Sequence, residues 1–195
     1  YRDELLDNVL PFWLEHSQDI EFGGYFSCLD REGKVFDTDK FIWLQGREVW
    51  MFSMLYNKVE KRQEWLDCAV QGGEFLKKYG HDGNYNWYFS LDRSGRPLVE
   101  PYNIFSYTFA TMAFGQLSLA TGNQEYADIA KKTFEIILSK VDNPKGKWNK
   151  LHPGTRNLKN FALPMILCNL ALEIEHLLDP GYLEQTMETC IHEVM

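Results

Sequence analysis

The chain is built mainly from amphipathic segments that have the spacing of α-helices. Apolar residues recur every three or four positions, with polar residues between them, as in helices that bury one face. Pro11 interrupts the first segment and is expected to kink it. The pattern predicts helices at residues 2–16, about 43–60, about 63–79, about 104–121, 124–140, about 158–178 and 182–194.

Two stretches, residues 23–37 and 86–102, alternate apolar and polar residues instead. Each surrounds a polar turn with glycine, DREG at 30–33 and DRSG at 92–95, and each is predicted to be a β-hairpin. The Leu-Asp-Arg triplets at 29–31 and 91–93 lie 62 residues apart, and the Gln-Glu pairs at 63–64 and 124–125 lie 61 apart. Two landmarks at nearly one offset indicate a repeat of one hairpin and two helices, with a degenerate third unit after residue 140.

A repeat of this size cannot bury its own apolar faces and must stack on its neighbours. The predicted fold is therefore all-α, with helix pairs arranged as part of a toroid and short β-hairpins in the loops. Six helix pairs would need roughly twice this chain, so we expect about half of such a ring. An open half ring exposes apolar flanks and is expected to be unstable or to self-associate. The first residue is not Met and no helix-stop signal precedes Met195, which suggests a fragment.

Composition narrows the class of protein. The net charge of −8 and the absence of a basic run argue against a nucleic-acid partner. No apolar run is long enough for a membrane span, and the N-terminus does not resemble a signal peptide. Aromatic residues make up 15% of the chain, which suits a large core or a carbohydrate cavity. The four cysteines form no CxxC pair, and the histidines lack metal-ligand spacing, so we expect a cytoplasmic protein with reduced thiols and no metal site of its own (Cys28, Cys68, Cys168 and Cys190).

The stretch Phe41–Trp50, FIWLQGREVW, combines three aromatic residues with one arginine. A helix that is aromatic on several sides is normally buried or lines a cavity. Arg47 in such a setting needs acceptors, because an unpaired buried charge costs several kcal/mol. It either pairs with a carboxylate, for which Glu48 and Asp39 are candidates, or faces an oxygen-rich ligand.

Three segments carry a resemblance to a known family: DTDKFIWLQGR at 37–47, VEPYNIFS at 99–106 and DNPKGK at 142–147. Their order and spacing resemble the N-acylglucosamine 2-epimerase (renin-binding protein) family, and are similar to its cyanobacterial and bacterial members. The resemblance covers nearly the whole chain and corresponds to the N-terminal half of that family. It implies an (α/α)6 barrel, with residues 1–195 as the N-terminal portion of a single barrel domain.

The resemblance implies a sugar 2-epimerase that interconverts N-acetylglucosamine and N-acetylmannosamine. One base removes the C2 proton of the ring-opened sugar, an enediolate-like intermediate forms, and an acid returns a proton to the other face. A histidine pair suits both roles. By the resemblance this pair lies beyond Met195, so the 195-residue piece alone is expected to be inactive. Related cellobiose epimerases carry a further histidine, and this chain has Leu170 at that position.

Five residues are candidates for substrate contact, because they begin equivalent helices of the two repeats. The resemblance directs Arg47 toward the sugar oxygens, and helix N-termini at these positions are expected to face the cavity mouth. Asn103 can instead be a helix N-cap, and Trp43 with Trp50 can instead belong to the core. The candidates are Trp43, Gln45, Arg47, Tyr102 and Asn103.

The basic loop at 142–150 is a candidate nucleotide site. Family members are activated by ATP without consuming it, and the resemblance points to this loop as the contact, although a solvated basic loop is the plain alternative. It lacks the spacing of a P-loop. The candidate residues are Lys145, Gly146, Lys147 and Lys150. The resemblance also implies a homodimer.

Two other functions stay open from the sequence. One is a binding protein without catalysis, as the name renin-binding protein suggests. The other is a glycosidase, for which Asp37 with Asp39, or Glu100, are the available carboxylates. The histidines of this chain are weak candidates for a catalytic base: His16, His81, His152, His176 and His192.

Overall fold

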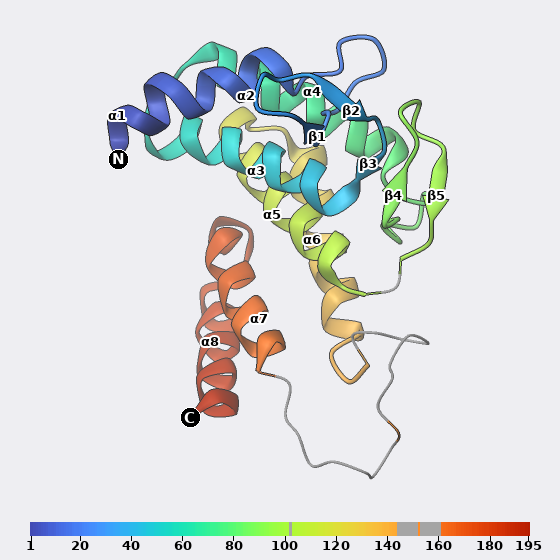
Figure 1. Cartoon of the computed structure of the whole chain (residues 1–195). Coiled ribbons are helices and arrows are strands. Elements are labelled where there is room, and N and C mark those ends of the chain that lie inside the picture. Colours follow the sequence, from blue (N-terminus) through green and yellow to red (C-terminus); the bar gives the residue numbers. More distant parts are fainter. Residues whose placement is uncertain (102, 144–151, 153–160) are drawn as a thin grey trace.

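The computed structural model describes residues 1–101, 103–143, 152 and 161–195. Helices dominate it, as the sequence predicts, and their ends lie within a few residues of the predicted ones where the chain is described (Figure 1). The helices are α1 (Arg2–Glu4), α2 (Leu10–His16), α3 (Ile42–Lys58), α4 (Gln63–Tyr79), α5 (Phe105–Thr121), α6 (Gln124–Ser139), α7 (Ala162–Glu173) and α8 (Pro180–Val194).

The predicted interruption at Pro11 takes the form of a wider helical turn. Residues Leu5–Val9 between α1 and α2 form a π-helical turn, in which the Leu10 N–H donates to the Leu5 carbonyl. Proline lacks an N–H and its ring clashes with the carbonyl four residues before it. A π-helical turn is one way for a helix to absorb such a break in its hydrogen-bond ladder.

The two predicted hairpins are confirmed, and their turns are built alike. Strands β1 (Cys28–Leu29) and β2 (Val35–Asp37) flank the first turn, and β4 (Ser90–Leu91) and β5 (Pro97–Val99) flank the second. In each turn an aspartate side chain, Asp30 or Asp92, accepts from two following backbone N–H groups. Gly33 and Gly95 then take positive φ values of 84° and 95°, which glycine adopts without strain. The repeated motif therefore specifies a repeated turn.

Strand β3 (Lys40–Phe41) was not predicted, and it joins the two repeats. It pairs antiparallel with β4, so the first repeat contributes one strand to the three-stranded sheet β3-β4-β5. Because β3 runs directly into α3, this pairing fixes the start of α3 against the second hairpin.

The helices pack as pairs, α3 with α4, α5 with α6 and α7 with α8. The first helix of each pair also contacts the first helix of the next, α3 against α5 and α5 against α7. Helix α5 is buried on almost every side, whereas α4 and α6 bury one face each. Gly46 allows the closest approach, because a Cβ there would lie 2.9 Å from the Phe109 backbone. The fold is an (α/α)6-type arrangement of helical hairpins, and the three pairs named above are the ones that the described residues form (Figure 1).

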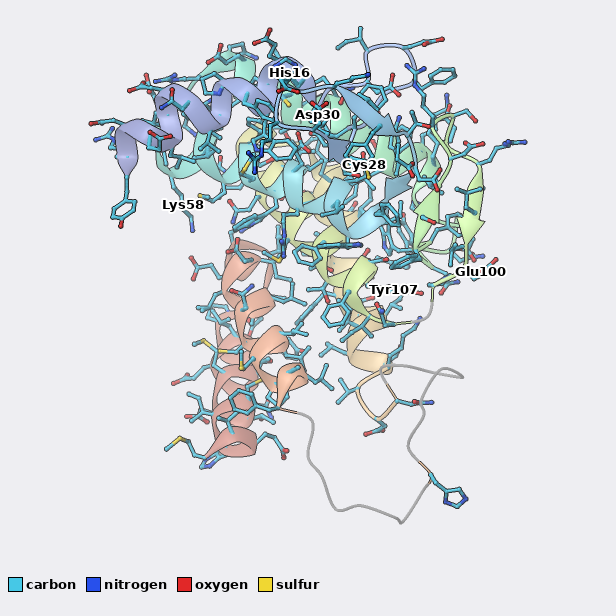
Figure 2. The ribbon with its side chains drawn as sticks, in the orientation of Figure 1. His16, Cys28, Asp30, Lys58, Glu100 and Tyr107 are labelled. Atoms are coloured by element: carbon cyan, nitrogen blue, oxygen red, sulfur yellow. The ribbon has the colours of Figure 1, made fainter. Side chains whose placement is uncertain are left out.

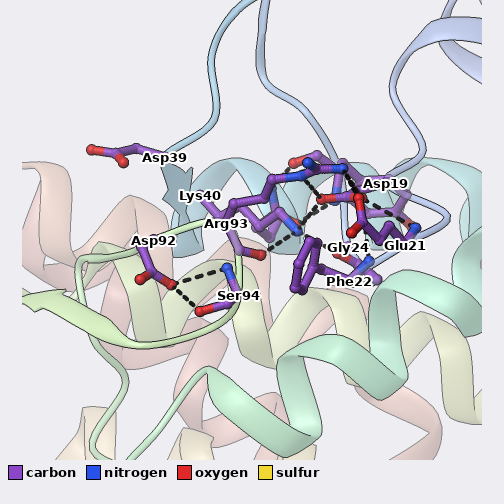
Figure 3. A network of polar contacts seen from close by, with 12 residues as sticks. Asp19, Glu21, Phe22, Gly24, Asp39, Lys40, Asp92, Arg93 and Ser94 are labelled. Carbon is purple, nitrogen blue, oxygen red and sulfur yellow. Dashed lines mark hydrogen bonds and ion pairs between the residues drawn. The ribbon is translucent and has the colours of Figure 1, made fainter.

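A buried ionic cluster joins the loop after α2 to strand β3 and to the turn between β4 and β5 (Figure 3). Asp19 is fully buried and accepts from Lys40 Nζ at 2.9 Å and from Arg93 Nε at 2.9 Å. Burial alone would raise the pKa of Asp19, but the bonds from Arg93 and Lys40 outweigh it and hold the pKa below its ordinary value. Lys40 also donates to the carbonyls of Gly23 and Arg93, so its charge is fully hydrogen-bonded.

Apolar side chains are exposed on the last helix pair. Phe161, Met165, Leu172, Ile191 and Val194 are each at least 40% exposed, and a hollow of about 390 Å³ lies between α7 and α8. This matches the exposed apolar flank expected of an open half ring; whether the chain self-associates stays a prediction. Among the described residues no helix has the length and hydropathy needed to cross a bilayer.

Candidate functional site

A hollow of about 1030 Å³ lies where α3, α5 and α7 meet. That is at the upper end of the range for small-molecule sites. Apolar and aromatic side chains make up most of its wall, and a few polar groups are placed among them. The lining residues are Trp43, Arg47, Trp50, Phe89, Asn103, Phe105, Ser106, Thr108, Phe109, Met112, Met165, Ile166 and Asn169.

The three helices that form the wall run in the same direction. Contacts between α3 and α5 advance together along both helices, from Gly46 with Phe109 to Asn57 with Gln116. Those between α5 and α7 do the same, because Met112 contacts Asn169 and Gln116 contacts Glu173. Parallel helices place residues one turn apart at successive depths of the wall.

Side chains four residues apart on each helix therefore form successive layers of the wall. On α3, Arg47 lies one turn beyond Trp43; on α5, Phe109 lies one turn beyond Phe105; and on α7, Asn169 lies one turn beyond Met165. Further along, Glu173 Oε2 accepts from Trp50 Nε1 at 2.9 Å and from Gln116 Nε2 at 3.0 Å. These bonds join α3, α5 and α7; Trp50 lines the cavity, whereas Gln116 and Glu173 do not.

Arg47 lies in the middle layer, supported by aromatic rings. Its guanidinium carbon is 4.6 Å from the centre of the Phe109 ring and 5.5 Å from the centre of the Trp43 ring. The side chain is exposed and forms no ion pair with any described carboxylate. The suggested pairing with Glu48 or Asp39 is therefore wrong. Stacking on rings holds the planar guanidinium in place while its N–H groups face the cavity.

Glu48, next to Arg47 in sequence, points the other way, toward Ser17, and is half-buried. The Ser17 hydroxyl lies within hydrogen-bond distance of both Glu48 Oε1 and the Trp13 carbonyl. Burial raises the pKa of Glu48 to about 8, and the contact with Ser17 offsets only part of this. A protonated Glu48 satisfies the geometry, because it donates to Ser17 while Ser17 donates to Trp13.

The remaining predicted substrate contacts divide into two groups. Trp43 and Asn103 line the cavity, and Trp50 lines it too, although a core position was the alternative. Gln45 does not line it: the side chain is buried, accepts from the Tyr25 N–H at 2.8 Å and donates to the Tyr25 carbonyl at 2.8 Å. Its role here is to hold the N-terminal loop. Asn103 Oδ1 also accepts from the Phe105 N–H at 2.9 Å, but the N-cap of α5 is Ile104, so Asn103 is not the N-cap that the sequence offered as an alternative.

Other candidates lie outside the described residues, namely Tyr102, Lys145, Gly146, Lys147 and Lys150. Residues of the wall that the sequence reasoning missed come from α7 and from the inner face of α5. The signal was present, because Met165, Asn169 and Glu173 follow one another at four-residue spacing, but nothing in one sequence says which neighbour that face meets.

None of the histidines described lines the cavity. His16 packs on Phe12 and against Gly33 of the first hairpin turn (Figure 2). His81 packs between Tyr85 and Trp87, and burial lowers its pKa. Burial also lowers the pKa of His176. The cavity wall, as far as it is described, holds no Asp or Glu either; Glu100 lies at the end of β5 (Figure 2).

The fold and the layered cavity define the class: the chain is an (α/α)6-type protein with a ligand-sized hollow at the N-terminal part of its inner helices. Residues 24–195 match the model of the N-acylglucosamine 2-epimerase (GlcNAc 2-epimerase) family. The chain belongs to this family.

Relatives of known name agree with this assignment. The chain is 41% identical over 174 residues to N-acylglucosamine 2-epimerase of Bos taurus, covering 87% of the chain and 41% of the relative. It is 40% identical over 174 residues to N-acylglucosamine 2-epimerase of Homo sapiens, again covering 87% and 41%. The solved structure of cellobiose 2-epimerase from Bacillus thermoamylovorans superposes with a TM-score of 0.82 at 23% identity, covering 98% of this chain and 53% of that one. The chain spans less than half the length of these two curated relatives.

Proposed function

We propose that the protein is a sugar 2-epimerase that interconverts N-acetylglucosamine and N-acetylmannosamine, and that this chain supplies one wall of its site. The observation that carries the proposal is Arg47, beside two aromatic rings in a cavity large enough to admit a sugar. Family membership supplies the reaction class. Aromatic faces suit the C–H surfaces of a sugar, and an arginine fork suits its oxygens.

Removal of the C2 proton leaves negative charge on the oxygen at C1 of the open-chain sugar. A fixed positive group beside that oxygen lowers the barrier, since the charge develops next to a donor already in place. Arg47 takes this role in the proposal. Its aromatic support keeps the guanidinium oriented before the sugar arrives, so little reorganisation is needed at the moment of reaction.

The acid and the base are proposed to lie outside this sequence, beyond Met195. What supports this is the described wall of the cavity, where Arg47 is the single ionisable side chain. A proton transfer at C2 requires groups that titrate near neutral pH and touch the substrate. The 195-residue chain by itself is therefore expected to be inactive.

Proton NMR of N-acetylmannosamine in D2O tests the proposal. The chain is compared with the longer product of its gene, where the gene encodes one. Loss of the C2 proton signal together with growth of N-acetylglucosamine, by the longer product alone, is the expected result. Exchange by the 195-residue chain would overturn the assignment of acid and base, and silence from both would overturn the epimerase.

A binding protein without catalysis is the second candidate. The composition of the described cavity wall favours it, since this wall can hold a sugar but offers no acid or base. Sugar binding by the longer product without exchange at C2 would establish it. A glycosidase is less well supported, because Asp37, Asp39 and Glu100 do not line the cavity, so chromogenic glycosides are expected to stay intact.

Three further proposals follow, two from the family resemblance and one from the cysteines. ATP is proposed as an activator that is not consumed, held by the lysine loop at 142–150, and a titration with ATP during the NMR assay tests it. A homodimer is proposed for the longer product and is tested by light scattering. A cytoplasmic location is proposed from the four cysteines, which are all free thiols.

A further inference from the structure

We propose that Asn169 recognises the N-acyl group of the substrate, with the acyl chain packed in the apolar corner formed by Met112, Met165 and Ile166. The inference rests on the proposed function, because it takes the substrate to be an N-acylated amino sugar. It goes further by assigning the residue that distinguishes such a sugar from one with a hydroxyl at C2.

Asn169 on α7 and Arg47 on α3 line the same cavity. The hydrogen bond from Trp50 on α3 to Glu173 on α7 ties the two helices together. Gly46, next to Arg47, approaches Phe109 on α5, and Asn169 contacts Met112 on α5, so Asn169 lies about one turn further along the wall than Arg47. A sugar whose C1 oxygen meets Arg47 can extend its C2 substituent along the wall toward Asn169.

The Asn169 amide has hydrogen-bonding capacity that the described protein does not use. Its Nδ2 lies 3.9 Å from Met112 Sδ, and a thioether is a weak acceptor. No described residue donates to its Oδ1. An acylamino group fits both atoms, because the ligand N–H donates to Oδ1 and the ligand carbonyl accepts from Nδ2. A hydroxyl cannot do the same, since it lacks the spaced donor and acceptor of an amide.

The surroundings of Asn169 suit the carbon atoms of an acyl group. Met112 lies next to it on α5, and Met165 and Ile166 precede it on α7. Met165 lines the cavity and is 53% exposed, and an apolar acyl chain lying against it would remove part of that surface from water. Methionine side chains adapt their shape readily, so this corner is expected to accept N-propanoyl as well as N-acetyl sugars.

Binding measurements on Asn169→Leu test the inference separately from catalysis. Isothermal titration of the longest product of the gene compares N-acetylmannosamine, N-propanoylmannosamine and mannose. In the unchanged protein the acylated sugars are expected to bind at least tenfold more tightly than mannose. Asn169→Leu is expected to weaken binding of the acylated sugars roughly tenfold, the size of two lost hydrogen bonds, and to leave mannose within twofold. Asn169→Asp, which keeps the acceptor and loses the donor, is expected to fall between.

Two controls separate recognition from general damage. Arg47→Ala is expected to weaken all three sugars alike, since it contacts an oxygen that they share. Asn8→Leu changes an exposed asparagine on the first helix whose amide bonds Glu4, and it is expected to change nothing. Saturation-transfer NMR of bound N-acetylmannosamine is expected to show the acetyl methyl among the most strongly saturated protons.

The failures of the two proposals are distinguishable. Exchange at C2 with no preference for acylated sugars, or equal losses for all sugars in Asn169→Leu, would overturn the role of Asn169 and leave the epimerase standing. Acyl-selective binding that depends on Asn169, without exchange at C2, would support the inference and overturn the epimerase. Absence of both binding and exchange would overturn both.

Discussion

At the scale of single residues, the environment of Arg47 predicts that lysine cannot replace it. The guanidinium carbon lies 4.6 Å from the centre of the Phe109 ring and 5.5 Å from that of the Trp43 ring, and an ammonium has neither the planar shape of a guanidinium nor its two-pronged donor geometry. Arg47→Lys is expected to lower sugar affinity tenfold or more while shifting the thermal midpoint of unfolding by no more than a few degrees. Titration calorimetry and a thermal scan measure the two effects.

Arg31→Lys is the matched control, because Arg31 is an exposed arginine in the first hairpin turn. It is expected to bind sugar as the unchanged protein does. If Arg47→Lys also retained full affinity, the rings beneath Arg47 would be packing partners and no more.

The raised pKa of Glu48 predicts that the stability of the fold changes with pH above the range in which carboxyl groups ordinarily titrate. Its pKa in the folded chain is about 8, against 4.5 for the reference side chain. The unfolded chain therefore releases this proton near pH 4.5 while the folded chain holds it until about pH 8. Between these values the unfolded state binds fewer protons, so the free energy of unfolding falls as pH rises, and it levels off above pH 8.

Glu48→Gln keeps the shape and removes the titration. The free energy of unfolding of the variant, relative to that of the parent, is expected to rise by a few kcal/mol from pH 5 to pH 9. Urea unfolding at both pH values measures it. The difference between the two proteins cancels the contributions of His81, His176 and the other groups that they share. An unchanged difference across this range would show that Glu48 is ionised in the folded state.

The residues of the stretch 41–50 illustrate how far one sequence can be interpreted at this scale. Trp43, Arg47 and Trp50 are spaced for one helix face, and they line the cavity together. The same spacing puts Gln45 on another face, so its exclusion from the cavity was available from the pattern. The raised pKa of Glu48 was not available, because it comes from burial against residues distant in sequence, among them Ser17, 31 positions away.

At the scale of elements, the Asp19 cluster determines how the loop before β1 holds β3 and the second hairpin. Lys40 is completely buried, so removing its partner leaves an uncompensated charge in the protein interior. Asp19→Ala is expected to cost about 3–5 kcal/mol in the free energy of unfolding, measured by urea titration.

The same cluster supplies its own control. Glu21 pairs with Arg93 at 3.0 Å, but its side chain is 66% exposed, and exposed pairs are worth about 0–1 kcal/mol. Glu21→Ala is therefore expected to change the free energy of unfolding by less than about 1 kcal/mol. Equal losses for the two variants would show that burial of Lys40 does not set the cost.

The repeat explains why the elements were predictable and their connections were not. Local patterns fix the helices, and the Asp-turn motif fixes both hairpins. The equivalent arginines nevertheless differ, since Arg93 binds Asp19 while Arg31 is exposed. Partners of that kind lie far apart in sequence, and periodicity carries no information about them. The β3-β4 pairing was missed for the same reason.

At the scale of the whole molecule, the ring-like packing followed from the repeat, because each hairpin-helix unit must cover its neighbour. The composition of the cavity did not follow, since its third wall comes from α7 of the degenerate unit. That unit lacks the landmarks that aligned the first two, so no pattern in the sequence indicates that Asn169 lies beside Met112.

The exposed apolar surface of α7 and α8 leads to a prediction whose sign depends on what covers it. For the 195-residue chain, Leu172 and Ile191 are 47% and 53% exposed, and apolar patches of this kind promote association. Leu172→Glu combined with Ile191→Glu is expected to shift light-scattering mass toward the monomer and to reduce binding of a hydrophobic dye. Phe36→Glu, which changes a 71% exposed residue on β2, is the control and is expected to leave both readings nearly unchanged.

In a longer product that packs further helices on this surface, Leu172→Glu combined with Ile191→Glu buries charge and is expected to lower the thermal midpoint instead, because an unpaired buried carboxylate is costly. A monodisperse 195-residue chain that binds no dye would contradict the first expectation. An unchanged midpoint in the longer product would show that the ring is not continued from this surface.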